Sequence, residues 1–184
     1  MNSNVILKKV FNYLNQSEVA NLIDVDENYQ LNESLCSMLE ILNSVVRKIA
    51  TEFVYCIKEE EIVCNNGKFK LSDLSEKFLF VRSLKNSIGL NVSYAENSGF
   101  LLTKSGVYNL RYCYLPKNVS FNCEIQDFPS FMIEEDVVLG ILAEYFLKLG
   151  YYEEYEIYES KFVEKLQKCS NKLSEMKVKR RLWL

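Results

Sequence analysis

Most of the side chains that commonly perform chemistry are missing from this sequence or lack the spacing that chemistry needs. The chain of 184 residues contains no histidine, which removes Ser-His-Asp and Cys-His nucleophile activation and the most common general base. A zinc site would need paired thiolates, but no two cysteines stand in a CxxC spacing. Without a signal peptide, we expect the cysteines to be reduced and mostly buried; they are Cys36, Cys56, Cys64, Cys113, Cys123 and Cys169.

The remaining candidates for a ligand or catalytic site are weak. No glycine-rich phosphate-binding loop of either common spacing is present. The run Asp24-Val25-Asp26-Glu27 lacks the glycine and the distal glutamate of a calcium loop. Glu134-Glu135-Asp136 could in principle supply paired carboxylates, but these residues open a predicted helix, where acids favour the positive end of the dipole. The sequence predicts no catalytic, cofactor or metal site, and no enzymatic activity.

One short stretch at the C-terminus is unusual in its composition. Residues 177–184, KVKRRLWL, here called the basic tail, combine four positive charges with an apolar end. A tryptophan beside positive charges is typical of docking on an acidic, partly apolar surface; the alternative is a frayed helix end whose cations favour the negative dipole terminus. The candidate partner-binding residues are Lys177, Lys179, Arg180, Arg181, Leu182 and Trp183.

The opposite charge is concentrated just before this end of the chain. The segment 133–160 has one base, Lys148, against the acids Glu134, Glu135, Asp136, Glu144, Glu153, Glu154, Glu156 and Glu159. The net charge of −3 over the whole chain argues against a protein that coats nucleic acid. The sequence contains no run of about 18 apolar residues, so we expect no membrane span. The N-terminus lacks the pattern of a secretion signal.

A helical hairpin is the element that must position these charges. Apolar residues at helical spacing predict two helices that meet at Gly150, which can adopt the left-handed conformation that ends a helix. The first, about Ile133 to Leu149, is apolar nearly all round, and the second carries one apolar stripe; that stripe is Tyr155, Tyr158, Phe162, Leu166, Cys169, Leu173 and Met176.

The preceding part of the chain divides into helices and strands. Periodicity predicts a helix from about Val5 to Leu14 capped by Ser3 or Asn4, and a helix from about Leu35 to Phe53 capped by Asn32 or Ser34. Between them we expect a short connection over 15–27 with room for one more helical turn. From Tyr55 the apolar period changes to two. Asn66-Gly67 predicts a two-residue type I′ hairpin, and further strands are expected at Phe78–Asn86, Leu90–Asn97, Phe100–Lys104 and Val107–Leu115.

These elements predict an α+β fold, because strands follow one another instead of alternating with helices. We expect one compact helical bundle with an inserted antiparallel β-meander. Its parts would be N-terminal helices over 1–54, a β-rich insertion over 55–127, and a C-terminal helical hairpin with its basic tail over 128–184.

The runs LNVSYAENSGFLLTKSGVYNLRYCYLP and FPSFMIEEDVVLGILAEYFLKLG resemble the head–tail adaptor (connector) proteins of tailed bacteriophages, including the tail tubular protein A group. Gly99–Thr103 and Tyr112–Tyr114 match the family's strand pattern, Phe128–Phe131 its turn, and Leu142–Tyr145 its helix. The similarity covers about Phe78 to Gln167. The hairpin at Asn66-Gly67 has no counterpart in that pattern, and LGILAEYFL is bulkier than the family's alanine-rich helix.

The resemblance implies a non-enzymatic virion protein that needs no cofactor. It would form a ring beneath the portal protein in the neck of the particle, contact neighbouring tail proteins, and let DNA pass as cargo. The family's C-terminal tail inserts into the portal rim, and the acidic hairpin could meet the basic tail of a neighbouring copy or of the portal. The alternative is a helical regulatory or nucleic-acid-binding module, which steeply salt-dependent DNA binding would reveal.

Overall fold

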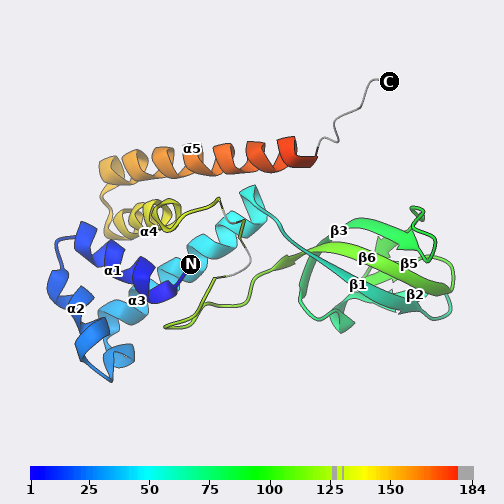
Figure 1. Ribbon diagram of the computed structural model, residues 1–184, viewed down its shortest axis with the longest axis horizontal. Coiled ribbons are helices and arrows are strands. Elements are labelled where there is room, and N and C mark those ends of the chain that lie inside the picture. Colours follow the sequence, from blue (N-terminus) through cyan, green and yellow to red (C-terminus); the bar gives the residue numbers. More distant parts are fainter. Residues whose placement is uncertain (126–127, 130, 178–184) are drawn as a thin grey trace. The chain divides into compact units, whose positions relative to one another are not determined.

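The computed structural model describes residues 1–125, 128–129 and 131–177, and it has an α+β fold (Figure 1). The chain forms two compact units, which are described separately here. The helical unit contains residues 1–54 and the described residues from 117 onward, and the β-rich unit contains residues 55–116. No helix in the described ranges is long and apolar enough to cross a membrane.

The N-terminal helices begin at asparagine caps. Helix α1 (Ser3–Tyr13) is capped by Asn2, whose side chain accepts the N–H of Asn4 at 2.9 Å. Neither expected cap residue caps the helix: Ser3 is buried and its hydroxyl donates to the Ser120 carbonyl at 2.9 Å, and the side-chain oxygen of Asn4 accepts the N–H of Asn122 at 2.9 Å. Helix α3 (Glu33–Lys48) is capped by Asn32, as expected, through the N–H of Leu35.

Two predictions in this region are wrong in extent. Residues 15–27 are more than a connection, because Ser17–Val25 form helix α2, which packs on α1 although only Ala20 is buried. A short turn (η1, Tyr29–Leu31) then leads to α3. The α-helix expected to reach Phe53 ends at Lys48 and continues as a π-helical turn (η2, Ile49–Phe53), which keeps Ile49 and Ala50 buried.

The predicted helical hairpin is confirmed. Helices α4 (Glu134–Leu149) and α5 (Tyr152–Lys177) lie side by side (Figure 1). Phe162, Leu166 and Cys169 of the α5 stripe are buried against the unit's core. Helix α4 is also packed against α1 and α3, which explains why it is apolar over most of its circumference; its buried apolar residues are Val137, Val138, Ile141, Leu142 and Ala143.

Residues 117–125 belong to the helical unit, which corrects the expected boundary at residue 127. The Asn43 side chain forms two hydrogen bonds with Val119, accepting its N–H at 2.7 Å and donating to its carbonyl at 3.0 Å. The N–H of Ile125 donates to the Met1 carbonyl at 2.7 Å. These bonds satisfy the backbone of a segment without regular structure, and they tie it to α1 and α3.

The β-rich unit contains two antiparallel three-stranded sheets in place of the single meander we expected. One has the order β1 (Cys56–Cys64), β6 (Gly106–Leu115), β3 (Lys77–Asn86). The other has the order β2 (Lys68–Lys70), β5 (Phe100–Leu102), β4 (Ala95–Asn97), and a short turn (η3, Leu71–Asp73) follows β2.

Strand β6, the last strand, lies at the centre of its sheet, and its apolar face is buried. Tyr108, Leu110 and Tyr112 alternate along β6 and are buried with residues of both sheets, including Leu84 and Leu101. A meander would leave β6 at an edge, whereas β1 and β3 now pair with both of its sides. The type I′ turn is confirmed: Asn66 and Gly67 have φ values of 52° and 75°, and Asn65 and Lys68 exchange two backbone hydrogen bonds.

The strand expected over Leu90–Asn97 is largely absent, since regular pairing covers only its last three residues. The side-chain oxygen of Asn86 accepts the N–H groups of Ile88 and Leu90, which folds this segment into a turn. An asparagine that binds the backbone two to four residues ahead competes with strand pairing in this way.

We expect Gly140→Ala to destabilise the protein, although alanine is the better helix former. A Cβ atom at Gly140 would lie 2.7 Å from the Phe162 ring and 2.8 Å from a Val45 methyl group. Overpacking of this kind costs about 1–3 kcal/mol. The free energy of unfolding in urea measures the cost, and the same change made with Phe162→Leu should cost less. An equal cost in both backgrounds would contradict this explanation.

Candidate functional site

The structure does not place the predicted partner-binding residues in one site. Lys177 is the last residue of α5, and Lys179, Arg180, Arg181, Leu182 and Trp183 lie outside the described residues. The structure does describe the acidic segment that we expected to face such a tail. The candidate functional site is therefore the helical hairpin.

The turn between α4 and α5 has a defined conformation. Gly150 has a φ of 79°, in the left-handed region that favours glycine. The N–H of Gly150 donates to the Leu147 carbonyl at 3.0 Å, and the N–H of Tyr151 donates to the Phe146 carbonyl at 3.0 Å. This pair of bonds is a Schellman motif, which satisfies the last carbonyl groups of α4.

Aromatic rings support the same turn. The Phe146 ring stacks on Tyr158 of α5, with the centroids 5.4 Å apart and the planes at 11°. Tyr145 and Tyr151 contact the Phe146 ring edge-on, at 5.7 and 6.3 Å. Aromatic pairs at these separations stabilise a fold by more than the effect of the area that they bury. These contacts therefore hold the backbone of the turn in place.

The outer surface of the turn, here called the hairpin tip, is both apolar and acidic. Its apolar members have exposed fractions between 52% and 66%, and they are Leu149, Tyr151, Tyr152 and Ile157. The acidic members, Glu153, Glu154 and Glu156, are also exposed. Large apolar side chains gathered among charges are characteristic of protein-docking surfaces.

The other acids of segment 133–160 have partners within the helical unit. Asp136 accepts the N–H of Ile133 at 3.1 Å, which confirms its role at the start of α4. Glu134 and Glu135 each pair with Lys9 of α1 at 2.6 Å. Among the described residues, no ion pair neutralises Glu153, Glu154 or Glu156. Within segment 133–160, the exposed acids without an ion-pair partner are therefore gathered at the hairpin tip.

Lys48 fixes the first half of α5 to α3. Its ammonium group lies 2.8 Å from Glu159 and 3.6 Å from Glu144, and 5.8 Å from the centre of the Phe162 ring. Burial alone would lower the pKa of Lys48, but the hydrogen bond to Glu159 and the two negative charges raise it above its usual value. The other oxygen of Glu159 is buried without a hydrogen-bond partner, so this carboxylate depends on Lys48.

The β-rich unit holds a separate polar cluster. The Tyr112 hydroxyl donates to Glu60 at 2.7 Å, and the Ser75 hydroxyl donates to the same oxygen of Glu60. Lys58 donates to Ser75 at 2.6 Å. Burial alone would raise the pKa of Glu60, but the hydrogen bonds from Ser75 and Tyr112 lower it.

This cluster is not arranged for nucleophilic catalysis. A serine nucleophile needs a base that accepts its proton, but the proton of Ser75 faces a carboxylate with a lowered pKa, which is a weak base. Lys58 donates to the serine oxygen and does not accept from it. The cluster instead supplies hydrogen bonds to a buried tyrosine, which stabilises the fold.

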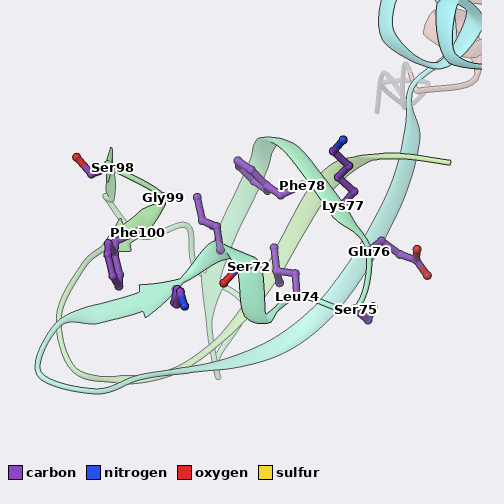
Figure 2. Close-up of a pocket in the computed structure, with 11 residues that line it drawn as sticks. Ser72, Leu74, Ser75, Glu76, Lys77, Phe78, Ser98, Gly99 and Phe100 are labelled. Carbon is purple, nitrogen blue, oxygen red and sulfur yellow. The ribbon is translucent and has the colours of Figure 1, made fainter. Parts of the chain in front are cut away.

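A pocket of about 570 Å³ lies beside this cluster (Figure 2). Figure 2 shows Ser75, Glu76 and Phe78 on one side of it and Ser98, Gly99 and Phe100 on the other. Its charges are mixed, with Lys70 and Lys77 against Glu76, so the pocket favours neither an anion nor a cation. In the part of the chain that the structure describes, no three cysteine or acidic side chains converge on a possible metal site. No disulfide joins the six cysteines.

We expect Lys48→Met to lower the free energy of unfolding by about 1–3 kcal/mol, because it leaves the Glu159 carboxylate without its charged partner. Since the pair raises the Lys48 pKa, the effect should be present below pH 10.5 and fade as the pH rises through the higher folded value. Lys168→Met is the control, because it breaks an exposed pair with Glu164, worth about 0.3–0.5 kcal/mol. Equal losses in urea unfolding would contradict the special role of Lys48.

Tyr112→Phe should lower the free energy of unfolding by about 1–2 kcal/mol at neutral pH through the lost hydrogen bond to Glu60. Burial and the bond to Glu60 raise the pKa of Tyr112 from 10.0 to about 12. The protonated phenol therefore stabilises the fold fully below pH 10.0, and this contribution disappears as the pH rises to about 12. The difference between wild type and variant should shrink over that range, whereas Tyr13→Phe, at an exposed position, should change nothing.

Comparison of the chain with models of known protein families and with curated proteins gives no match. Three features of the chain therefore bear on its function. They are the geometry of the hairpin tip, the separation of the acidic segment 133–160 from the basic tail, and the resemblance of the chain's residues to the connector pattern.

Proposed function

We propose that this chain is a non-enzymatic structural protein of a phage or prophage particle. In this proposal it is a head–tail connector subunit that docks on the portal protein and assembles into a ring for DNA passage. The main support is the hairpin tip, a firmly built surface with exposed apolar side chains and three unneutralised acids. Such a surface suits a protein that works by binding other proteins.

The positions of the resembling residues add to this support. The strand pattern falls on β5 and β6, and the helical pattern falls on α4. These are the central strands of the two sheets and the helix at the centre of the helical unit's packing. The residues that carry the resemblance are therefore the ones on which the packing of each unit depends.

The separation of charge along the chain fits assembly. The acidic tip lies at the start of α5, and the basic tail follows its end. A subunit with unlike ends can form a heterologous contact, which generates a closed ring if the rotation between neighbours closes. A net negative charge would also let DNA pass through such a ring without binding to it. The protein would be made in the host cytoplasm and end in the neck of the virion.

Mixing the chain with the portal protein encoded beside its gene tests this function. We expect ring-shaped complexes by negative-stain electron microscopy, and a strong loss of them when residues 177–184 are deleted. A chain carrying Leu182→Ala and Trp183→Ala but all four charges separates the apolar from the electrostatic contribution. Circular dichroism should show that each variant remains folded.

The possible results lead to different conclusions. Portal binding that survives the deletion would remove the basic tail from the docking role. No complex with any portal preparation would contradict the connector function. DNA binding that weakens steeply with salt, in the absence of rings, would favour the nucleic-acid-binding module, because phosphate contacts release counterions.

A further inference from the structure

We infer that the hairpin tip of one copy is the docking surface for the basic tail of a second copy of this chain. The inference rests on the proposed function in that it takes the chain to assemble with itself, and it specifies the surface through which neighbouring copies meet. It commits the tail to a neighbouring copy, so the loss of portal rings expected on deletion of residues 177–184 would follow from lost contacts between copies.

The hairpin tip offers two kinds of complementarity to the tail. Its exposed tyrosines and aliphatic side chains, such as Tyr151, Tyr152 and Ile157, can cover the tail's apolar end. Its three acids face the tail's cations, which include two arginines. Arginine binds carboxylates through paired donors and also stacks on tyrosine rings. The apolar and charged parts of the tail therefore each find a matching part of the tip.

The acids of the tip are available because no ion pair among the described residues engages them. Glu144 and Glu159 pair with Lys48, and Glu134 and Glu135 pair with Lys9. The tip acids lie in the first turns of α5, where they complement the positive end of the helix dipole. Like-charged tips would repel one another, so two copies are not expected to join tip to tip.

The length of α5 prevents a chain from reaching its own tip. Figure 1 shows the α4–α5 turn at one end of α5, and the helix ends at Lys177. Ile157, the tip residue nearest to that far end, lies about 30 Å from Lys177 at 1.5 Å per helical residue. The seven residues after Lys177 extend at most about 25 Å. The backbone of the tail therefore stops short of its own tip, and the tail can lie across a whole hairpin tip only on another copy.

The exposed charges along α5 also favour a contact between unlike parts of two copies. Its first turns carry the tip acids, whereas Lys161 and Lys165 are exposed further along the helix, where Lys168 pairs with the exposed Glu164. A second copy that brings its tail to the tip therefore brings unlike charges together. If each tail binds the next copy in turn, the contact closes a ring, and if two copies exchange tails, it forms a dimer.

A charge-swap experiment on the full-length chain tests the contact. The tail-reversed variant carries Lys179→Glu, Arg180→Glu and Arg181→Glu, and the tip-reversed variant carries Glu153→Lys, Glu154→Lys and Glu156→Lys. We expect the wild type to self-associate in sedimentation velocity at low salt and to dissociate as salt is added. Each variant alone should associate at least about tenfold more weakly. An equal mixture of the two should restore association, because every tail then finds a tip of opposite charge.

Fluorescence gives a second readout, since Trp183 is the only tryptophan of the chain. Its emission should shift to shorter wavelength as concentration rises, and Tyr152→Ser should reduce the shift. The matched control carries Glu27→Lys, Glu59→Lys and Glu61→Lys, which changes three exposed acids elsewhere by the same charge. This control should associate like the wild type. Circular dichroism verifies that all variants keep their helical content.

Three results would overturn the inference: a wild-type chain that stays monomeric up to about 1 mM at low salt, a mixture of folded variants that fails to recover association, or a Trp183 shift that does not depend on concentration. Failure of the proposed function is distinguishable from these results. Self-association that needs both tip and tail, without portal rings, would leave the inference standing and remove the portal role. Portal rings that survive tip reversal would do the opposite.

Discussion

Helix α4 approaches its neighbours so closely at Gly140 that a single added methyl group would lie 2.7 Å from the Phe162 ring. This close approach brings α3, α4 and α5 into one core, with Val45, Ile141 and Phe162 buried around the glycine. Because the core is packed to the density of a solid, the axis of α5 is fixed relative to α4. The positions of the Gly150 turn and of every side chain on it follow from this constraint.

Ion pairs within the helical unit then determine which acids of segment 133–160 remain available to a partner. Lys9 and Lys48 each form ion pairs with two of the acids in segment 133–160, and Asp136 binds the backbone at the start of α4. The acids that remain are gathered at the hairpin tip together with large apolar side chains. A surface of this kind suits recognition by shape, apolar contact and charge, which is the basis of the assembly role that we propose.

In the β-rich unit, the burial of apolar side chains likewise determines how the strands are arranged. Buried polar groups then find hydrogen-bond partners within that arrangement. Strand β6 is central because its tyrosines and Leu110 require cover from both sheets. The buried hydroxyl of Tyr112 then needs a partner, which Glu60 supplies. The resulting cluster contains a serine and a lysine in contact, and its hydrogen-bond directions give it a structural role.

Local patterns in the sequence were enough to predict the α+β class, the Gly150 hairpin, the Asn66-Gly67 turn and the part of the α5 stripe from Phe162 to Cys169 that is buried, because helical periodicity and turn chemistry act between near neighbours. The strand order, the extent of α2 and the assignment of residues 117–125 were decided by tertiary structure, since they depend on contacts between residues far apart in the chain. The acidic character of segment 133–160 was likewise evident from the sequence. Which of its acids lack an ion-pair partner was settled only when folding brought Lys9 and Lys48 beside the others.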